Sequence, residues 1–557
     1  MTEESYSSKM LATESLTSTR ELVAKKTGVI RSSCSLCQNF CGLLATVQDG
    51  KVMKLEGDPD NPRNYGHLCA KGLSAFLSIY SPRRITKPLM RTNPKKGLGV
   101  DPKWKEISWD EAINVIAQRV EAVRKKYKIG LGSPDAISWM GGSSRIMVTT
   151  FDHPALYYGV HNCWVAALDA FLAVMGAACY CGNAVHPPSY LNTSTFEITP
   201  DAEYGKYLLL IGSQAGSIIN YDTMNVARHI AEKRPGEVKV TVVDPLCSYA
   251  ASRAEEWVPI RPGTDAAFIM ALVNLLINEY GIYDANFLKK QSNAPYLVKS
   301  DGLFMRDKKT NKPLIWDPAD SKAKPVGEAN VRDYALEGSY VVDDVRCKPG
   351  FQMIKEHVKK YTPEFAAEIT SISAETIRRI AKEVGEAAQI GKTITIDGVE
   401  MPYRPVSVVW YRGISAHKHA YLTGFAAMLL PTLLGAIQVP GGITGAPPAK
   451  EEYDEDGLMV SKPWLGAPYP PRPVTKPKRI DLYELFPVGP YSYPLAIPVL
   501  LNPETFGLKK DQIERPEILI TWRDNAVKNM FSPEIVAEAY SQIPFMVAFN
   551  VEPDETM

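Results

Sequence analysis

Four cysteines near the N-terminus have the spacing of a metal-binding site. Cys34, Cys37 and Cys41 lie within eight residues, and Cys69 follows after 27 intervening residues. Thiolate sulfur suits both iron–sulfur clusters and zinc, although structural zinc sites usually pair two short two-cysteine segments. The three-plus-one spacing therefore favours a [4Fe–4S] cluster. Zinc is the alternative, and four unliganded buried thiols are the third interpretation.

Lys71 lies two residues after the fourth cysteine, in the sequence Cys69-Ala70-Lys71-Gly72. On composition alone, a lysine at this place is a solvated surface residue. It gains a chemical meaning only if an anionic or redox-active group binds beside the cluster.

Length and composition limit the classes of protein to which the chain can belong. Its 557 residues are 45% hydrophobic and too many for one core, so three or more domains are expected. Lys and Arg number 63 against 62 Asp and Glu, which argues against a nucleic-acid partner and against disorder. The nine cysteines are too unevenly placed for a disulfide framework. No signal peptide or membrane-spanning apolar run is evident, so a soluble, cytoplasmic protein is expected.

Short apolar runs that alternate with helical stretches predict parallel α/β units. Residues 43–55 are expected to form a hairpin that turns at Asp49-Gly50, and residues 293–348 a polar, irregular surface insertion. The expected strands are residues 207–211, 238–243, 406–411, 518–522 and 545–549, and the main helices are residues 109–127, 223–233, 266–280, 374–386 and 422–434.

These elements predict a multidomain α/β chain, in which an N-terminal iron–sulfur domain precedes two doubly wound, Rossmann-like α/β domains. The iron–sulfur domain is expected to comprise residues 1–95 with part of 448–515. The first α/β domain is expected to combine residues 96–165, 390–447 and 516–557. The second is expected to span residues 166–389, with the insertion at 293–348.

Several motifs resemble the molybdopterin oxidoreductases of the dimethyl-sulfoxide-reductase family, which bind molybdenum or tungsten through two pterin guanine dinucleotides. The cysteine spacing, ending in Cys69-Ala70-Lys71-Gly72, resembles the N-terminal signature of that family. Further matches follow in order at residues 82–89, 109–112, 257–265 and 435–442. The resemblance implies two cofactors, a [4Fe–4S] cluster and a bis-molybdopterin guanine dinucleotide with Mo or W. It also implies that Lys71 bridges the cluster and a pterin.

The resemblance places the dinucleotide contacts at strand ends, where ligands of open parallel sheets bind. There the backbone of residues 212–214 would approach pyrophosphate, and Asp244 would accept hydrogen bonds from guanine. Leu246 stands where the family usually has Arg, a departure from its pattern. Taken singly, each of these residues is an ordinary turn or cap residue. The expected cofactor contacts are Gly212, Ser213, Gln214, Asp244, Gly263, Thr264, Asp265, Arg523 and Asn525.

In this family, one protein side chain often completes the coordination of the Mo or W ion. Within residues 175–188, Cys181 aligns best with the ligand cysteine of acetylene-hydratase-like members, and Cys179 is the second choice. A thiolate is a sensible ligand for Mo or W. A competing alignment with formate dehydrogenases puts His186 directly after the ligand position, which Val185 would then occupy without being able to coordinate. His186 is a candidate for proton transfer, with a purely structural role as the alternative.

The resemblance implies the catalytic subunit of a Mo- or W-dependent oxidoreductase that carries out two-electron redox chemistry or hydroxyl or oxygen-atom transfer on a small molecule. The cluster would relay electrons to a ferredoxin-like iron–sulfur subunit. Hydratase chemistry is disfavoured because Gln38 stands where acetylene hydratase has its catalytic Asp. The alternatives are a non-catalytic electron-transfer or scaffold subunit, or a truncated fragment. The C-terminal domain of the family is expected to be absent after Met557, or to be supplied by a separate chain.

Overall fold

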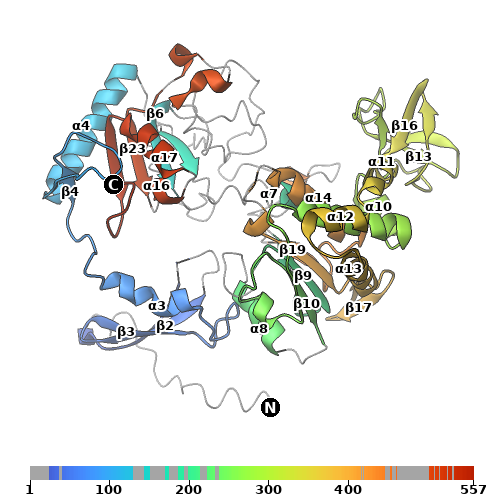
Figure 1. Ribbon diagram of the computed structural model, residues 1–557, viewed down its shortest axis with the longest axis horizontal. Coiled ribbons are helices and arrows are strands. Elements are labelled where there is room, and N and C mark those ends of the chain that lie inside the picture. The colour runs from blue at the N-terminus through green and yellow to red at the C-terminus, as the bar shows by residue number, and fades with distance from the viewer. Residues whose placement is uncertain are drawn as a thin grey trace.

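The computed structural model contains three bodies among the residues that it describes (Figure 1): a small antiparallel sheet and two parallel sheets flanked by helices. No helix in this part of the chain has both the length and the apolar character needed to cross a bilayer. The described residues are 24–34, 36, 41–128, 143–150, 170–174, 186–193, 198–213, 223–232, 237–414, 417, 419–445, 452–453, 459–460, 501–506, 509–513, 515–522, 525–529 and 532–557.

The N-terminal body is a three-stranded antiparallel sheet followed by one helix. The expected hairpin is confirmed, because Asp49 and Gly50 take φ angles of 50° and 77° between its two strands, and a tight two-residue turn needs such positive values. The helix packs on the third strand. The elements are β1 (Gly28–Ser33), β2 (Gly42–Gln48), β3 (Lys51–Gly57) and α3 (Ala70–Ile79).

The first parallel sheet, which we call sheet I, has the order β24-β23-β6-β7. Helix α4 packs on it through Val120 and Val123, which share a hydrophobic cluster with Ile146 and Ile518. Ser108 caps α4 as expected, since its hydroxyl accepts a hydrogen bond of 3.1 Å from the Glu111 amide. The elements are β4 (Leu89–Arg91), β5 (Trp104–Glu106), α4 (Trp109–Tyr127), β6 (Ser143–Thr150), β7 (Ala170–Val174), β23 (Ile518–Trp522), α16 (Ala526–Asn529), α17 (Pro533–Ser541) and β24 (Phe545–Phe549).

The second parallel sheet, sheet II, has the order β11-β10-β9-β19. Its strands stand in the chain order 3-2-1-4, which is the order of the first four strands of the Rossmann fold. All five residues of β9 and of β19 are buried, as the continuous apolar runs predict. The elements are α7 (His186–Thr193), β9 (Tyr207–Ile211), α8 (Thr223–Glu232), β10 (Lys239–Val243), β11 (Glu256–Val258), α9 (Asp265–Asn274), α12 (Pro363–Thr370), α13 (Ala374–Ala387), β19 (Val406–Trp410) and α14 (Ala420–Leu433).

Two strands, β19 and β7, lie in a different sheet from the one expected from the sequence. Residues 390–447 were expected in the first α/β domain, yet β19 pairs in parallel with β9 of sheet II. Residues 166–389 were expected in the second, yet β7 pairs with β6 of sheet I. Both sheets are made of similar buried apolar runs, so one sequence does not reveal which runs are neighbours. The remaining domain boundaries stay predictions.

The insertion at residues 293–348 is built of short strands, and the expectation of irregular structure is therefore wrong. Its strands were missed because each has only three to five residues, too few to show a clear hydrophobic period. In this insertion Trp316 stacks on Tyr340, and the buried Lys324 ammonium lies 2.8 Å from the Asp317 carboxylate. The elements of the insertion and the two helices beside it are α10 (Ala285–Gln291), β12 (Leu297–Lys299), β13 (Leu314–Asp317), β14 (Lys322–Pro325), β15 (Tyr340–Val342), β16 (Val345–Pro349) and α11 (Gly350–His357).

Elsewhere in the described chain, three two-stranded sheets are formed by β17 (Thr393–Ile396) with β18 (Val399–Pro402), by β8 (Ile198–Pro200) with β20 (Ile443–Gly445), and by β21 (Glu452–Tyr453) with β22 (Met459–Val460).

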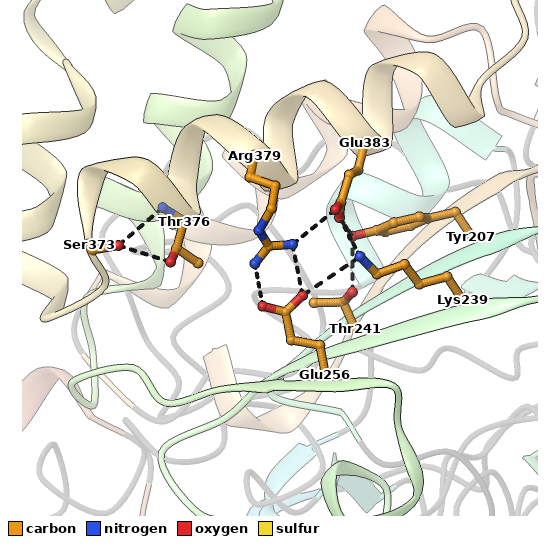
Figure 2. Close-up of polar contacts among 8 residues, drawn as sticks. All are labelled: Tyr207, Lys239, Thr241, Glu256, Ser373, Thr376, Arg379 and Glu383. Carbon is orange, nitrogen blue, oxygen red and sulfur yellow. Dashed lines mark hydrogen bonds and ion pairs between the residues drawn. The ribbon is translucent and has the colours of Figure 1, made fainter. Parts of the chain in front are cut away.

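Helix α13 is attached to sheet II by a network of polar contacts (Figure 2). The Glu383 carboxylate accepts hydrogen bonds from Lys239 at 2.7 Å and from the Tyr207 hydroxyl at 3.1 Å. Arg379, one turn earlier, contacts both Glu383 and Glu256. Lys239 and Tyr207 are the first residues of their strands, so the network lies at the amino-terminal edge of the sheet. The opposite, carboxyl-terminal edge is the one at which ligands of parallel sheets usually bind.

Candidate cofactor sites

Three of the described cysteines, Cys34, Cys41 and Cys69, lie where β1, β2 and α3 meet. Cys34 and Cys41 are both buried, and the Cys34 amide donates a 2.8 Å hydrogen bond to the Cys41 carbonyl. Cys69 immediately precedes the first residue of α3. A Cβ atom on Gly72, in the first turn of that helix, would lie 3.7 Å from the Cys34 sulfur. The start of α3 is therefore held against the first cysteine.

The surroundings of these thiols suit an iron–sulfur cluster. Cys34 and Cys41 belong to an apolar cluster against which Leu68 and Phe76 pack, and none of the three cysteines forms a disulfide. The amino-terminal end of a helix favours anionic thiolates such as Cys69 would supply. Among the described residues, no three His, Cys, Asp or Glu side chains converge closely enough to hold a metal ion. Cys37 lies outside those residues, so the four-cysteine ligand set stays a prediction.

Lys71 is exposed on the first turn of α3, two residues beyond Cys69. The structure thus puts it on the helix that begins at a predicted cluster ligand. Its role between the cluster and a pterin remains a prediction.

Two glycines meet at the carboxyl edge of sheet II. Gly212 follows β9 and Gly413 follows β19, and the Gly413 amide donates a 2.9 Å hydrogen bond to the Gly212 carbonyl. Gly212 has a φ angle of 55°, and a Cβ atom on it would lie 2.7 Å from the Gly413 Cα. The strand order of the sheet reverses between β9 and β19, which makes this a topological switch point, the usual binding crevice of such sheets.

The glycines let the ends of β9 and β19 approach this closely, because a side chain on either would clash with the backbone of the other. Phosphate groups usually bind at such a switch point, beside the segment that follows Gly212. Ser213, the next residue, is buried, and Gln214 lies outside the described residues. The sequence analysis did not name Gly413 as a site residue. Its only signal was that it follows a buried strand, and its pairing with Gly212 depends on which strands are neighbours.

Two carboxyl groups lie along the same edge. Asp244 follows β10 and accepts a 2.9 Å hydrogen bond from the Leu246 amide, while Asp265 is the first residue of α9 and only 5% exposed. Burial is the main cause that raises the pKa of Asp265 to about 6; a backbone hydrogen bond acts to lower it, and the negative charge of Asp244 adds a smaller raising effect. Carboxylates at this edge are suited to accepting hydrogen bonds from a base. Leu246 itself is 74% exposed.

The turn before α9 leaves open space. Gly263 has a φ angle of 77°, and a Cβ atom there would meet nothing within 4 Å. Thr264 occupies the cap position, but its hydroxyl donates to the Arg261 carbonyl at 2.6 Å instead of capping the helix. The residues predicted from the sequence as a cofactor contact therefore form a self-closed turn at the helix start.

Half-buried His417 is a residue that the sequence analysis missed. It follows β19 and Gly413, its Nδ1 accepts a 3.2 Å hydrogen bond from the His419 amide, and burial, with the neighbouring His419, lowers its pKa. Among the described residues, its Nε2 atom is buried without a hydrogen-bond partner. An unpaired polar atom beside the switch point fits a crevice that a polar cofactor occupies.

The remaining predicted residues are only partly described. Asn525 follows β23 at the carboxyl edge of sheet I, and its Oδ1 accepts a 2.9 Å hydrogen bond from the Thr556 hydroxyl. His186 is the first residue of α7. Cys179, Cys181 and Arg523 lie outside the described residues, and their predicted roles stay predictions.

Sequence comparisons identify the two parts of the chain. Residues 27–81 match the molybdopterin oxidoreductase Fe4S4 domain, and residues 84–446 match the molybdopterin oxidoreductase family. The fold is thus that of an α/β oxidoreductase with an iron–sulfur domain. The chain belongs to the molybdopterin oxidoreductase family, and its cofactor class is a [4Fe–4S] cluster with a molybdopterin-bound Mo or W.

Individual relatives support the same family. The sulfite dehydrogenase of Allochromatium vinosum has a subunit that is 29% identical over 85% of this chain and 50% of its own length. The molybdopterin-containing subunit of the arsenate respiratory reductase of a Shewanella species is 26% identical over 77% of this chain and 43% of its own. The chain thus spans about half the length of these relatives. The fold is similar to that of acetylene hydratase from Pelobacter acetylenicus, with a TM-score of 0.58 and 17% identity over 93% of this chain and 60% of that chain.

Proposed function

We propose that this chain forms the catalytic part of a Mo- or W-dependent oxidoreductase. The observation that carries the proposal is the glycine pair at the switch point of sheet II, Gly212 and Gly413, in the same chain as the cysteine-bearing body. The switch point of a parallel α/β sheet is the usual place for a dinucleotide, which supports a cofactor-binding role over a scaffold role. The cofactor supplies two-electron chemistry when bound, and the protein supplies its position.

The predicted contact residues divide between the two pterin guanine dinucleotides of the metal cofactor. Gly212, Ser213 and Gln214 hold the pyrophosphate of one dinucleotide, and Asp244 with Asp265 accepts hydrogen bonds from its base. Asn525 serves the second dinucleotide at the edge of sheet I. Supporting this division, each sheet offers its residues at its carboxyl edge.

A small inorganic oxoanion is the substrate class that we infer. The relatives that match this chain include enzymes named for sulfite, arsenate, selenate and perchlorate, and the sulfite dehydrogenase relative matches over most of it. Sulfite oxidation would combine sulfite with water to give sulfate, two protons and two electrons. The electrons then need an acceptor, and a partner protein with an iron–sulfur centre is suited to receive them through the cluster.

Metal analysis of the anaerobically purified chain, with any polypeptide that co-purifies, tests the proposal. We expect about four irons per chain, Mo or W with pterin, a cluster signal in electron paramagnetic resonance and sulfite-dependent reduction of a dye. Zinc in place of iron, with no pterin, would overturn the assignment. A cluster without pterin would instead support a non-catalytic electron-transfer protein.

A further inference from the structure

The buried side chain of Asn64 connects the two cysteine-bearing segments. Its Oδ1 accepts a 2.7 Å hydrogen bond from the Gly42 amide, and its Nδ2 donates to the Gly42 carbonyl at 3.0 Å and to the His67 carbonyl at 2.8 Å. Gly42 directly follows Cys41, and His67 lies two residues before Cys69. One amide group therefore fixes the backbone beside the third cysteine of the predicted ligand set and beside its last member.

The loop that carries Asn64 has a closely packed backbone. The Asp58 carbonyl accepts hydrogen bonds from Asn61 at 3.2 Å and from Gly66 at 2.9 Å. A Cβ atom on Gly57 would lie 2.1 Å from the Gly66 carbonyl oxygen, so the two ends of the loop touch. Because Asn64 is 0% exposed, an amide there is costly unless it is hydrogen-bonded, and its bonds to both segments meet that need.

Tyr65, the residue after the buried Asn64, has an exposed side chain. Its φ angle is 43°, an uncommon value for a residue other than glycine. The guanidinium carbon of Arg228, on α8, lies 4.0 Å from the centre of the Tyr65 ring, within the range of a cation–π contact. Arg228 is also paired with Glu232 at 2.8 Å. Figure 1 shows α8 on the side of the sheet II unit nearest to β2 and β3.

Helix α8 is the crossover between β9 and β10, and it follows the Gly212–Gln214 segment in the chain. A contact to α8 is thus a contact to the unit that forms the switch-point crevice. The loop of residues 57–67 touches the cysteine segments on one side and this unit on the other.

We propose that Asn64 is a positioning residue for the iron–sulfur cluster, and that Tyr65 docks the cluster-bearing body on α8 through Arg228. The inference rests on the proposed function, because it assumes that Cys41 and Cys69 are ligands of the same cluster. In this proposal the Asn64 hydrogen bonds set the separation of the ligand segments, and the contact of Tyr65 with Arg228 joins the cluster-bearing body to the sheet II unit.

Variants of Asn64 test the first half of the proposal. Asn64→Ala removes all three hydrogen bonds, and Asn64→Asp keeps the acceptor for the Gly42 amide but loses both donated bonds. The matched control is Asn93→Ala, because Asn93 donates a 2.8 Å side-chain hydrogen bond to the Asp101 carbonyl away from the cysteines. Each full-length chain is reconstituted anaerobically with ferrous iron and sulfide, and iron content, paramagnetic resonance signal and midpoint potential are measured.

We expect Asn64→Ala to weaken iron retention by about 10- to 100-fold, as losing an outer-shell contact of a metal site typically does. Asn64→Asp should lie between the wild type and Asn64→Ala, with a changed resonance signal, while Asn93→Ala matches the wild type. Wild-type iron retention and signal in Asn64→Ala would overturn the proposal. If that variant is insoluble, the same result in Asn64→Asp overturns it. A wild-type chain that takes up no cluster would instead contradict the proposed function.

Variants of Tyr65 test the docking contact without relying on the cluster. Tyr65→Phe keeps an aromatic face for Arg228, whereas Tyr65→Leu and Arg228→Gln remove the cation–π contact. Hydrogen exchange of the full chain should become faster in residues 57–67 and in α8 for the last two variants only. Unchanged exchange in both Tyr65→Leu and Arg228→Gln would show that the loop does not dock on α8.

Discussion

Asp265 combines two surroundings with opposite effects on its charge. It starts helix α9, where the helix dipole favours a carboxylate, yet burial is the stronger influence and raises its pKa from 3.8 to about 6. The folded chain therefore retains a proton that the unfolded chain has already released. The group stabilises the fold fully below about pH 4, and this contribution is lost as the pH rises through 6.

Replacing Asp265 with Asn should remove that pH dependence in the cofactor-free chain. Relative to the wild type, we expect the free energy of unfolding of Asp265→Asn to rise by about 1–3 kcal/mol between pH 4 and pH 7, because the variant never buries a charge. Urea denaturation at a series of pH values measures the difference. The exposed first-turn acid of α4, Asp110, provides the control variant Asp110→Asn. A difference that stays flat with pH would contradict the burial argument.

Lys71 should affect electron transfer without affecting the fold. Its side chain is exposed, so Lys71→Gln is expected to keep the thermal stability and iron content of the wild type. If the lysine lies between cluster and pterin, the rate of cluster reduction by substrate should fall by about tenfold or more, equivalent to about 1.4 kcal/mol in the barrier. Stopped-flow absorbance of the cluster follows that rate. The exposed Lys54→Gln on β3 is the control, and equal rates in both variants would exclude the role.

The attachment of α13 to sheet II depends on the charge of Glu383. Burial acts to raise the pKa of this carboxyl group, but hydrogen bonds and charge from Lys239 and Arg379 outweigh it, and the pKa is lowered. Its stabilising contribution is thus present at neutral pH and is lost as the pH falls below the ordinary glutamate range. The contribution joins two elements, because Glu383 lies on α13 and its partners Lys239 and Tyr207 lie at the strand starts drawn in Figure 2.

We expect Glu383→Gln to lower the free energy of unfolding at pH 7 by about 1 kcal/mol, the upper range for a partly exposed ion pair. The cost should shrink below about pH 4, where the wild-type carboxylate is protonated as well. Glu386→Gln is the matched control on the same helix, because Glu386 and its partner Lys382 are well exposed and 3.9 Å apart. An equal loss of unfolding free energy in the two variants at pH 7 would show that the Glu383 contacts stabilise the fold no more than an exposed ion pair does.

Helices and strands were predictable where the local sequence shows a clear hydrophobic pattern, a cap residue or a turn motif. The run 207–211 matches β9, residues 109–127 match α4, and the caps and turns were recognised from Ser108 and Asp49-Gly50. Neighbour relations were not predictable, because β19 and β7 carry no mark of the sheet that they join. For the same reason Gly212 could be proposed as a site residue while its partner Gly413 could not. Asn64 was also missed, since its three hydrogen bonds depend on a loop whose path the sequence does not reveal.

At the scale of the whole molecule, contacts between distant segments join the separate parts of the described chain. The Ile85 amide, in the linker after α3, donates a 2.8 Å hydrogen bond to the Val551 carbonyl beyond β24. Tyr65 and Arg228 connect the N-terminal body to α8. A cofactor bound across such bodies would add much of the stability that holds them together.

Chain purified with its pterin cofactor should therefore unfold at a higher temperature than chain from a host unable to make molybdopterin. A ligand that binds only the folded state at a concentration about 100 times its Kd adds about 2.7 kcal/mol. Scanning calorimetry compares the two preparations after their iron contents have been matched. Identical transitions would mean that the pterin contributes nothing to the assembly of the fold.

Sheet I is assembled from two distant stretches of chain, with all of sheet II encoded between them. During translation, β6 and β7 leave the ribosome long before β23 exists to pair with β6. The nascent polypeptide must carry this half of sheet I through the synthesis of an entire second sheet. Folding of this chain is thus ordered from the outset: sheet II can form first, and the carboxyl edge of sheet I, where Asn525 lies, is complete only when residues 518–549 have been made.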